Sequence, residues 1–117
     1  MDMTHVELVS TITSAVRGRG AAAALAELRA SRPAFTTVGY HDTAAVFTVW
    51  AVDRLIAAGR TDRQILWHPL TDARSMQAWW DDATLASDAA RDGFVPSTVA
   101  LVGDPVPCEP AELAPAA

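Results

Sequence analysis

Cysteine, lysine and asparagine are scarce or missing in this sequence of 117 residues. Cys108 is the single cysteine, so no internal disulfide can form and a disulfide-stabilised scaffold is excluded. This usage is typical of a reducing compartment. All nine cationic side chains are arginines, a bias that GC-rich coding explains without any special arginine chemistry.

Positive charge and long apolar runs are also scarce. Fourteen acidic and nine basic side chains leave a formal net charge of −5, whereas a nucleic-acid-binding protein needs a cationic surface. The most apolar stretch, residues 44–52, is less than half of the roughly twenty residues that a membrane-spanning helix needs. The first residues lack a basic segment followed by an apolar run, so no secretory signal is visible. We therefore expect a soluble, cytoplasmic, acidic protein that binds neither nucleic acid nor membrane.

Half of the residues are hydrophobic and 20% are charged, which excludes an intrinsically disordered chain. A chain of this length forms one domain. Four prolines and two glutamates in residues 105–117 predict a flexible acidic tail. The compact domain is therefore expected to span residues 1–104.

Helix signals are clearest in the first half of the chain. Residues 5–17 carry apolar side chains three or four apart, after a capping-box spacing of Thr4 and Glu7, and Gly18 is a candidate left-handed stop. Residues 21–30 are strong helix formers, and the short link predicts a helical hairpin.

Residues 44–58 are apolar nearly all round and are followed by Gly59, which predicts a buried helix. The alternative is a hairpin in which residues 35–40 pair with residues 45–52. A further capping box, Thr61 to Gln64, predicts a short helix before Pro69. The next helix is predicted to start at Thr71 and Asp72 and to continue to Leu85, and a last helical turn is expected over residues 87–93.

Two β-branched runs, residues 35–40 and 98–102, are typical of short strands that could pair with each other. The fold class that follows is a mainly helical α+β single domain. The alternative is an all-α helical bundle in which both runs are loops.

The histidines do not match a metal-binding spacing, because His5, His41 and His68 are far apart in the sequence. No metal site and no cofactor are expected. His41 and Asp42 precede the 44–58 helix, where ligand-binding or catalytic groups often lie. Asp42 and Thr43 are also good helix N-caps, and this structural role is the favoured interpretation.

Tryptophan is unusually frequent, and the candidate ligand- or partner-binding residues are Trp50, Trp67, Trp79, Trp80 and Arg74. On a helix, adjacent positions point about 100° apart. One residue of the Trp79–Trp80 pair is therefore expected in the core and the other at its edge, and the remaining tryptophans are expected in the core. Arg74 could meet an anionic partner.

No nucleophile or phosphate-binding motif is present, so an enzymatic activity is neither indicated nor excluded. The chain carries more apolar bulk than a small interior can hide, which predicts a non-catalytic interaction module that self-associates or serves as a small subunit. Its expected contact elements are residues 44–58 and the Trp79–Trp80 helix. The alternative is a small enzyme or small-molecule-binding protein with a Trp-lined apolar pocket, in which His41 and Asp42 are the polar groups.

Overall fold

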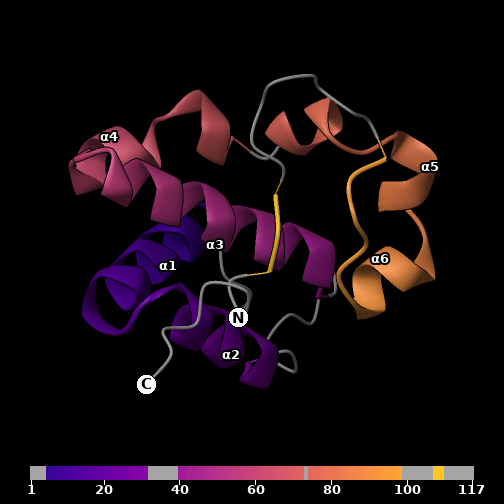
Figure 1. Ribbon diagram of the computed structural model, residues 1–117, viewed down its shortest axis with the longest axis horizontal. Coiled ribbons are helices and arrows are strands. Elements are labelled where there is room, and N and C mark those ends of the chain that lie inside the picture. Colours follow the sequence, from indigo (N-terminus) through magenta and orange to yellow (C-terminus); the bar gives the residue numbers. More distant parts are fainter. Residues whose placement is uncertain (1–4, 32–39, 73, 99–106, 110–117) are drawn as a thin grey trace.

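The computed structural model describes residues 5–31, 40–72, 74–98 and 107–109, and every regular element in these ranges is helical. Figure 1 shows their arrangement around one long helix. In chain order they are α1 (His5–Arg19), α2 (Ala21–Ala30), α3 (Asp42–Ala57), α4 (Asp62–Leu66), the 3-10 helices η2 (Pro69–Thr71) and η3 (Ser75–Ala78), α5 (Asp82–Leu85) and α6 (Asp88–Asp92).

The expected α+β fold is wrong, because the described ranges contain no strand, and the all-helical alternative is closer. Residues 35–39 and 99–102 of the two predicted strands lie outside the described residues. Thr98 is described, and its N–H donates to the carbonyl of Trp79 at the end of η3, at 2.9 Å. The β-branched composition that suggested strands is a context-dependent signal. The N–H of Thr98 therefore bonds to the carbonyl at the end of η3 and not to a neighbouring strand.

α1 and α2 form the predicted hairpin, but the turn lies at Gly20 and not at Gly18. Gly20 has a φ of 92°, a conformation that costs little without a β-carbon, whereas Gly18 lies inside α1. Thr4 of the expected capping box lies outside the described residues. The hairpin packs against α3 through a core of aliphatic side chains that includes Val9, Ile12, Leu25, Leu28, Val46 and Val49.

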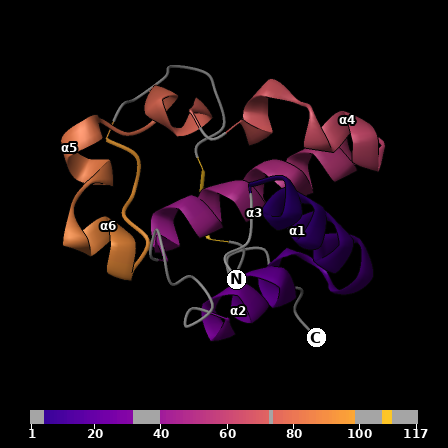
Figure 2. The same ribbon diagram turned by 180° about the vertical axis from the view of Figure 1, so that it is seen from behind.

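α3 is the central element. It lies between the α1–α2 hairpin and the short helices that follow α4 (Figures 1 and 2). This confirms the predicted helix over residues 44–58 and rejects the hairpin alternative. Since neighbours cover it on several sides, its apolar side chains are buried nearly all round, as the pattern indicated. Gly59, with a φ of 80°, ends it as expected.

The capping box of α4 is also confirmed. The hydroxyl of Thr61 accepts the N–H of Gln64 at 3.2 Å, and Oε1 of Gln64 accepts the N–H of Thr61 at 2.9 Å. Two backbone donors at the start of this short helix are thereby satisfied reciprocally.

The single helix expected from Thr71 to Leu85 is wrong, because the chain forms η2, η3 and α5 instead. Short polar side chains capture the backbone groups that a continuous helix would use. Oδ1 of Asp72 accepts the N–H of Arg74 at 2.9 Å, and the hydroxyl of Ser75 donates to the carbonyls of Leu70 and Asp72. Such local bonds compete with helix propagation and start new turns.

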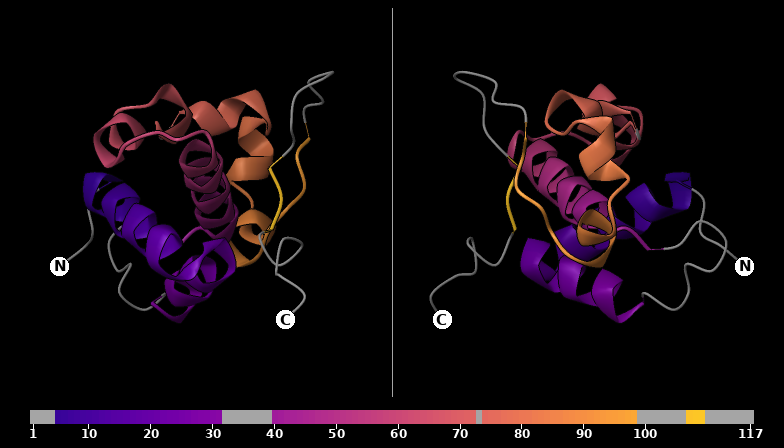
Figure 3. Two further views of the ribbon diagram at one scale, coloured as in Figure 1. Left: turned by 60° about the vertical axis from the view of Figure 1, so that its left-hand side comes forward. Right: turned by 90° about the vertical axis from the view of Figure 1, so that its right-hand side faces the viewer.

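Residues 107–109 lie against the body of the molecule (yellow in Figure 3). Pro107 is buried, and Cys108 is half-buried against the core cluster that contains Phe47 and Trp50 of α3 together with Trp80. The predicted domain boundary at residue 104 stays a prediction, since residues 99–106 and 110–117 lie outside the described ranges. Among the described helices, none combines the length and apolarity needed to traverse a lipid bilayer.

Candidate functional site

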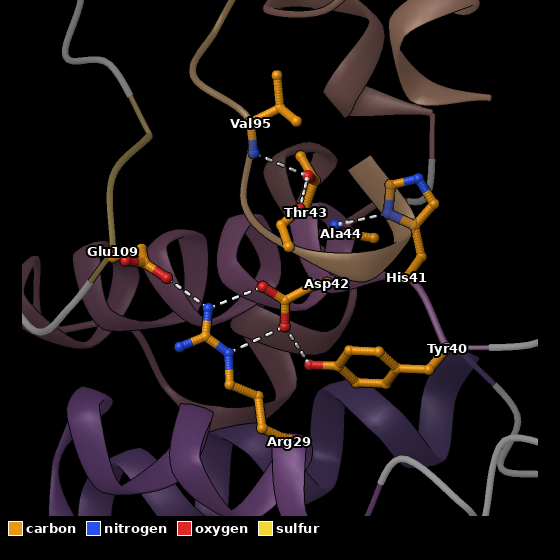
Figure 4. A network of polar contacts seen from close by, with 9 residues as sticks. Arg29, Tyr40, His41, Asp42, Thr43, Ala44, Val95 and Glu109 are labelled. Carbon is orange, nitrogen blue, oxygen red and sulfur yellow. Dashed lines mark hydrogen bonds and ion pairs between the residues drawn. The ribbon is translucent and has the colours of Figure 1, made fainter. Parts of the chain in front are cut away.

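A buried carboxylate lies at the start of α3. Asp42 is 1% exposed, and Arg29 at the end of α2 contacts it at two points. Nε of Arg29 donates to Oδ1 at 2.9 Å and Nη2 donates to Oδ2 at 2.7 Å. The hydroxyl of Tyr40 donates to Oδ1 at 2.7 Å, and Nη2 of Arg29 also donates to Glu109 (Figure 4). We call these four residues the Arg29 junction.

The Arg29 junction joins three distant parts of the chain through one guanidinium. The hydrogen bond to Asp42 raises the pKa of Arg29 above its ordinary value, partial burial opposes this rise, and the hydrogen bond to Glu109 adds to it. Charge-assisted two-point contacts of this kind are among the strong hydrogen bonds in proteins. The junction therefore fastens α2, α3 and residues 107–109 together, and each of its members contacts protein groups.

His41, and not Asp42 or Thr43, is the N-cap of α3. Its Nδ1 accepts the N–H of Ala44 at 3.0 Å, so the neutral ring carries its proton on Nε2, which donates to the carbonyl of Leu85 at 2.7 Å (Figure 4). The prediction that a side chain caps this helix start is confirmed, but the cap is His41 and not Asp42 or Thr43. Catalytic roles for His41 and Asp42 stay untested predictions, with both ring nitrogens bonded to backbone groups.

Thr43 has a third structural role at this helix start. Its hydroxyl donates to the carbonyl of Gly93 at 3.0 Å and accepts the N–H of Val95 at 3.1 Å. The segment after α6 is thereby tied to α3, at a residue that is itself fully buried.

The tryptophans separate into a core cluster and one exposed ring. Trp80 is fully buried and its Nε1 donates to the carbonyl of Val95 at 2.8 Å. Trp50 is buried and Trp79 is half-buried, with ring centroids 5.7 Å apart, and Phe47 packs against all three indoles. The expectation of one core and one edge residue in the Trp79–Trp80 pair is confirmed, although no continuous helix carries them.

Trp67 is the exception, and its expected place in the core is wrong. It is 70% exposed because α4 ends at Leu66 and Trp67 is the C-cap, beyond the turn that packs on the core. Val6, on the first turn of α1, is 44% exposed. These two are the exposed large hydrophobic residues of the described ranges.

Val6 and Trp67 line the same open depression, which has a volume of about 440 Å³. The other lining residues are His5, Leu66, His68, Pro69, Thr71 and Asp72. A smaller depression of about 100 Å³ adjoins it and shares His5, Thr71 and Asp72. Its remaining lining is mostly apolar: Leu8, Ala44, Phe47, Thr48 and Met76. We call the two together the His5 groove, with an outer and an inner part.

Backbone hydrogen bonds hold the two histidines of the groove. Nε2 of His5 lies 2.7 Å from the carbonyl of Thr71, and Nδ1 of His68 accepts the N–H of Leu70 at 3.0 Å. Sequence reasoning missed this groove, since His5 and Thr71 are 66 residues apart. Arg74, a predicted binding residue, is exposed and lines neither part.

Within the described ranges, no group of three or more potential metal ligands converges. Over the residues that the structure describes, the protein is mainly helical, with an aliphatic core beside an aromatic cluster and a shallow surface groove lined in part by Trp67. Comparison with protein-family models, curated proteins and solved structures finds no match to this chain.

Proposed function

We propose that this chain is a small non-catalytic binding module and that the His5 groove is its binding surface. The supporting observation is the position of Trp67, whose indole is 70% exposed and lies with Val6 in one depression. Leaving an apolar ring in water forgoes the roughly 25 cal/mol per Å² that burial gives. Exposed apolar patches commonly mark binding sites, and tryptophan is enriched among the residues that dominate interfaces.

The proposed contact surface differs from the one expected from the sequence. Residues 44–58 and the Trp79–Trp80 pair contribute mainly to the core, so these elements leave little apolar surface for a partner. The alternative function is a Trp-lined pocket with His41 and Asp42 as polar groups. It has less support, because both side chains already form hydrogen bonds to other groups of the protein. A cytoplasmic location, suggested by composition, remains part of the proposal.

The test is a ¹H–¹⁵N NMR titration of the full chain with a neutral aromatic amide such as N-acetylphenylalanine amide. We expect shifts confined to the His5 groove that are lost in Trp67→Ala. Arg91→Ala on α6, where the side chain is also exposed, is the control and should keep them. Shifts outside the groove, or equal shifts in Trp67→Ala, would contradict the proposal.

A concentration series by sedimentation velocity shows whether the partner is a second copy. If the chain self-associates through the groove, the average mass rises with concentration in the wild type and in Arg91→Ala but stays constant in Trp67→Ala. If the partner is another protein, all three stay monomeric, while the NMR shifts persist in the wild type and in Arg91→Ala.

A further inference from the structure

From the groove's lining we infer that its occupant is a basic segment of a partner protein, with an apolar side chain in the inner part and an arginine or lysine side chain between Trp67 and Asp72. This inference rests on the proposed function. It adds the chemistry of the partner.

The sizes of the two parts favour a peptide segment over a small metabolite. Small-molecule sites typically enclose roughly 300–1,000 Å³ and bury most of the ligand. The inner part, at about 100 Å³, has room for a single side chain. The outer part is larger but open, so whatever lies there keeps contact with solvent. A chain that places one side chain inside and runs on across the surface matches this shape.

The charge of the groove is negative. Asp72 lines both parts and, apart from the histidines, is the titratable side chain in the combined lining. Arg63 and Arg74 are exposed and lie near the lining residues in the sequence, but neither lines the groove. A cationic partner is attracted at this position, and an anionic partner meets both Asp72 and the −5 charge of the whole chain.

The groove also offers more hydrogen-bond acceptors than donors. Oδ1 of Asp72 accepts the N–H of Arg74, and no donor in the described ranges reaches Oδ2. When Nε2 of a neutral His5 donates to Thr71, its Nδ1 is left as an acceptor. His68 offers the one ring donor, because its Nδ1 already accepts a backbone N–H. Guanidinium and ammonium groups are donors without acceptors, and they complement this set.

The exposed indole of Trp67 provides the third element. Among aromatic side chains, tryptophan attracts a cation over its face most strongly. The chain uses the same contact internally, where the guanidinium of Arg54 lies 5.2 Å from the ring centroid of Trp50. Trp67 has a comparable face turned largely to solvent.

The test compares two short peptides, acetyl-Leu-Gly-Arg-amide and acetyl-Leu-Gly-Glu-amide, in ¹H–¹⁵N NMR titrations of the full chain at low salt. We expect the basic peptide to shift the signals of His5, Trp67 and Asp72, with affinity at least about three-fold higher than that of the acidic peptide. Added salt should narrow this difference, because screening weakens exposed charge contacts.

Asp72→Asn is the decisive variant, since the amide oxygen can still accept the N–H of Arg74 and the local turn is retained. We expect it to lower affinity for the basic peptide by about three-fold and to leave the acidic peptide unchanged or slightly better bound. Asp82→Asn, an exposed carboxylate on α5 outside the groove, is the matched control and should change neither affinity.

The outcomes separate the two proposals. Equal binding of both peptides, or an Asp72→Asn variant that behaves as wild type, overturns the basic-partner inference and leaves the groove as a binding surface. If neither peptide nor the neutral amide shifts the signals of the groove, the proposed function is overturned as well. Self-association that Trp67→Ala abolishes identifies a second copy as the occupant and overturns the inference.

Discussion

Arg29 and Asp42 form a two-point ion pair that joins the end of α2 to the start of α3, with N···O distances of 2.9 and 2.7 Å. Asp42 is 1% exposed and the side chain of Arg29 is 38% exposed, so the carboxylate depends on a partner that is itself partly in water. Burying a carboxylate without a partner is expensive, and this dependence makes Arg29 a critical residue of the fold.

Replacing Arg29 by Met leaves the Asp42 charge buried and without its guanidinium. Removing one member of a buried pair costs about 3–5 kcal/mol, and we expect about 2–3 kcal/mol here because the Arg29 side chain is partly exposed. Urea denaturation measures the loss of unfolding free energy. Adding Asp42→Asn to this variant should recover part of it, since the uncompensated charge is then gone.

Arg19→Met is the matched control. Arg19 pairs with Glu27 on the surface, where both side chains are about half-exposed, and solvent screening makes the contribution of such a pair to stability small. Equal destabilisation by Arg29→Met and Arg19→Met would contradict the importance assigned to the Arg29 junction.

His41 stabilises α3 through its cap and α5 through the bond to Leu85. We expect His41→Ala to lower the unfolding free energy by about 1–2 kcal/mol. His41→Asn should recover about half of this, because an asparagine side chain can accept the N–H of Ala44 but is too short to replace the imidazole at Leu85. Chemical denaturation of the three proteins gives the comparison, and an Asn variant no better than Ala would argue against the cap.

Asp81 connects stability to pH. The backbone N–H of Thr84, donating at 2.7 Å, holds the pKa of this carboxylate below its ordinary value of 3.8. A depressed pKa in the folded state means that Asp81 stabilises the fold above about pH 3.8 and that this contribution is lost as pH falls through the folded pKa. The stability difference between wild type and Asp81→Ala should therefore shrink from about pH 5 towards about pH 2. A difference that is constant over this range would contradict the assignment.

Gly18 and Gly20 should respond in opposite directions to alanine. Gly18 lies inside α1, where an added methyl group meets open space, so Gly18→Ala should raise stability by about 0.5–1 kcal/mol through helix propensity. Gly20 has a φ of 92°, and Gly20→Ala should lower stability by about 1 kcal/mol. Thermal or urea unfolding measures both. If both variants change the unfolding free energy in the same direction, the assignment of the turn to Gly20 is contradicted.

Local signals predicted much of the helical structure. The capping box at Thr61, the glycine after α3 and the all-round apolar pattern of residues 44–58 each act within a few residues, and the structure uses all three. The helix expected from Thr71 to Leu85 failed because Asp72, Ser75 and Asp81 bond to nearby backbone groups, a competition that apolar periodicity does not register.

The sites depend on contacts across the chain and were therefore out of reach of local patterns. Arg29 meets Glu109 across 80 residues, and His5 meets Thr71 across 66. The sequence marked His41 and Asp42 as a junction of interest, but their partners Leu85 and Arg29 could not be inferred. Trp67 is exposed because α4 ends at Leu66, whereas the sequence predicted a helix that continues towards Pro69.

The contact between Arg29 and Glu109 has a consequence for biosynthesis. α2 is synthesised before Glu109, so the guanidinium at its end acquires its second carboxylate only when residue 109 has been added. A nascent chain that stops before that point contains Asp42 and Arg29 but not Glu109. A premature stop codon upstream of Glu109 therefore yields a product that lacks the ion pair between Arg29 and Glu109.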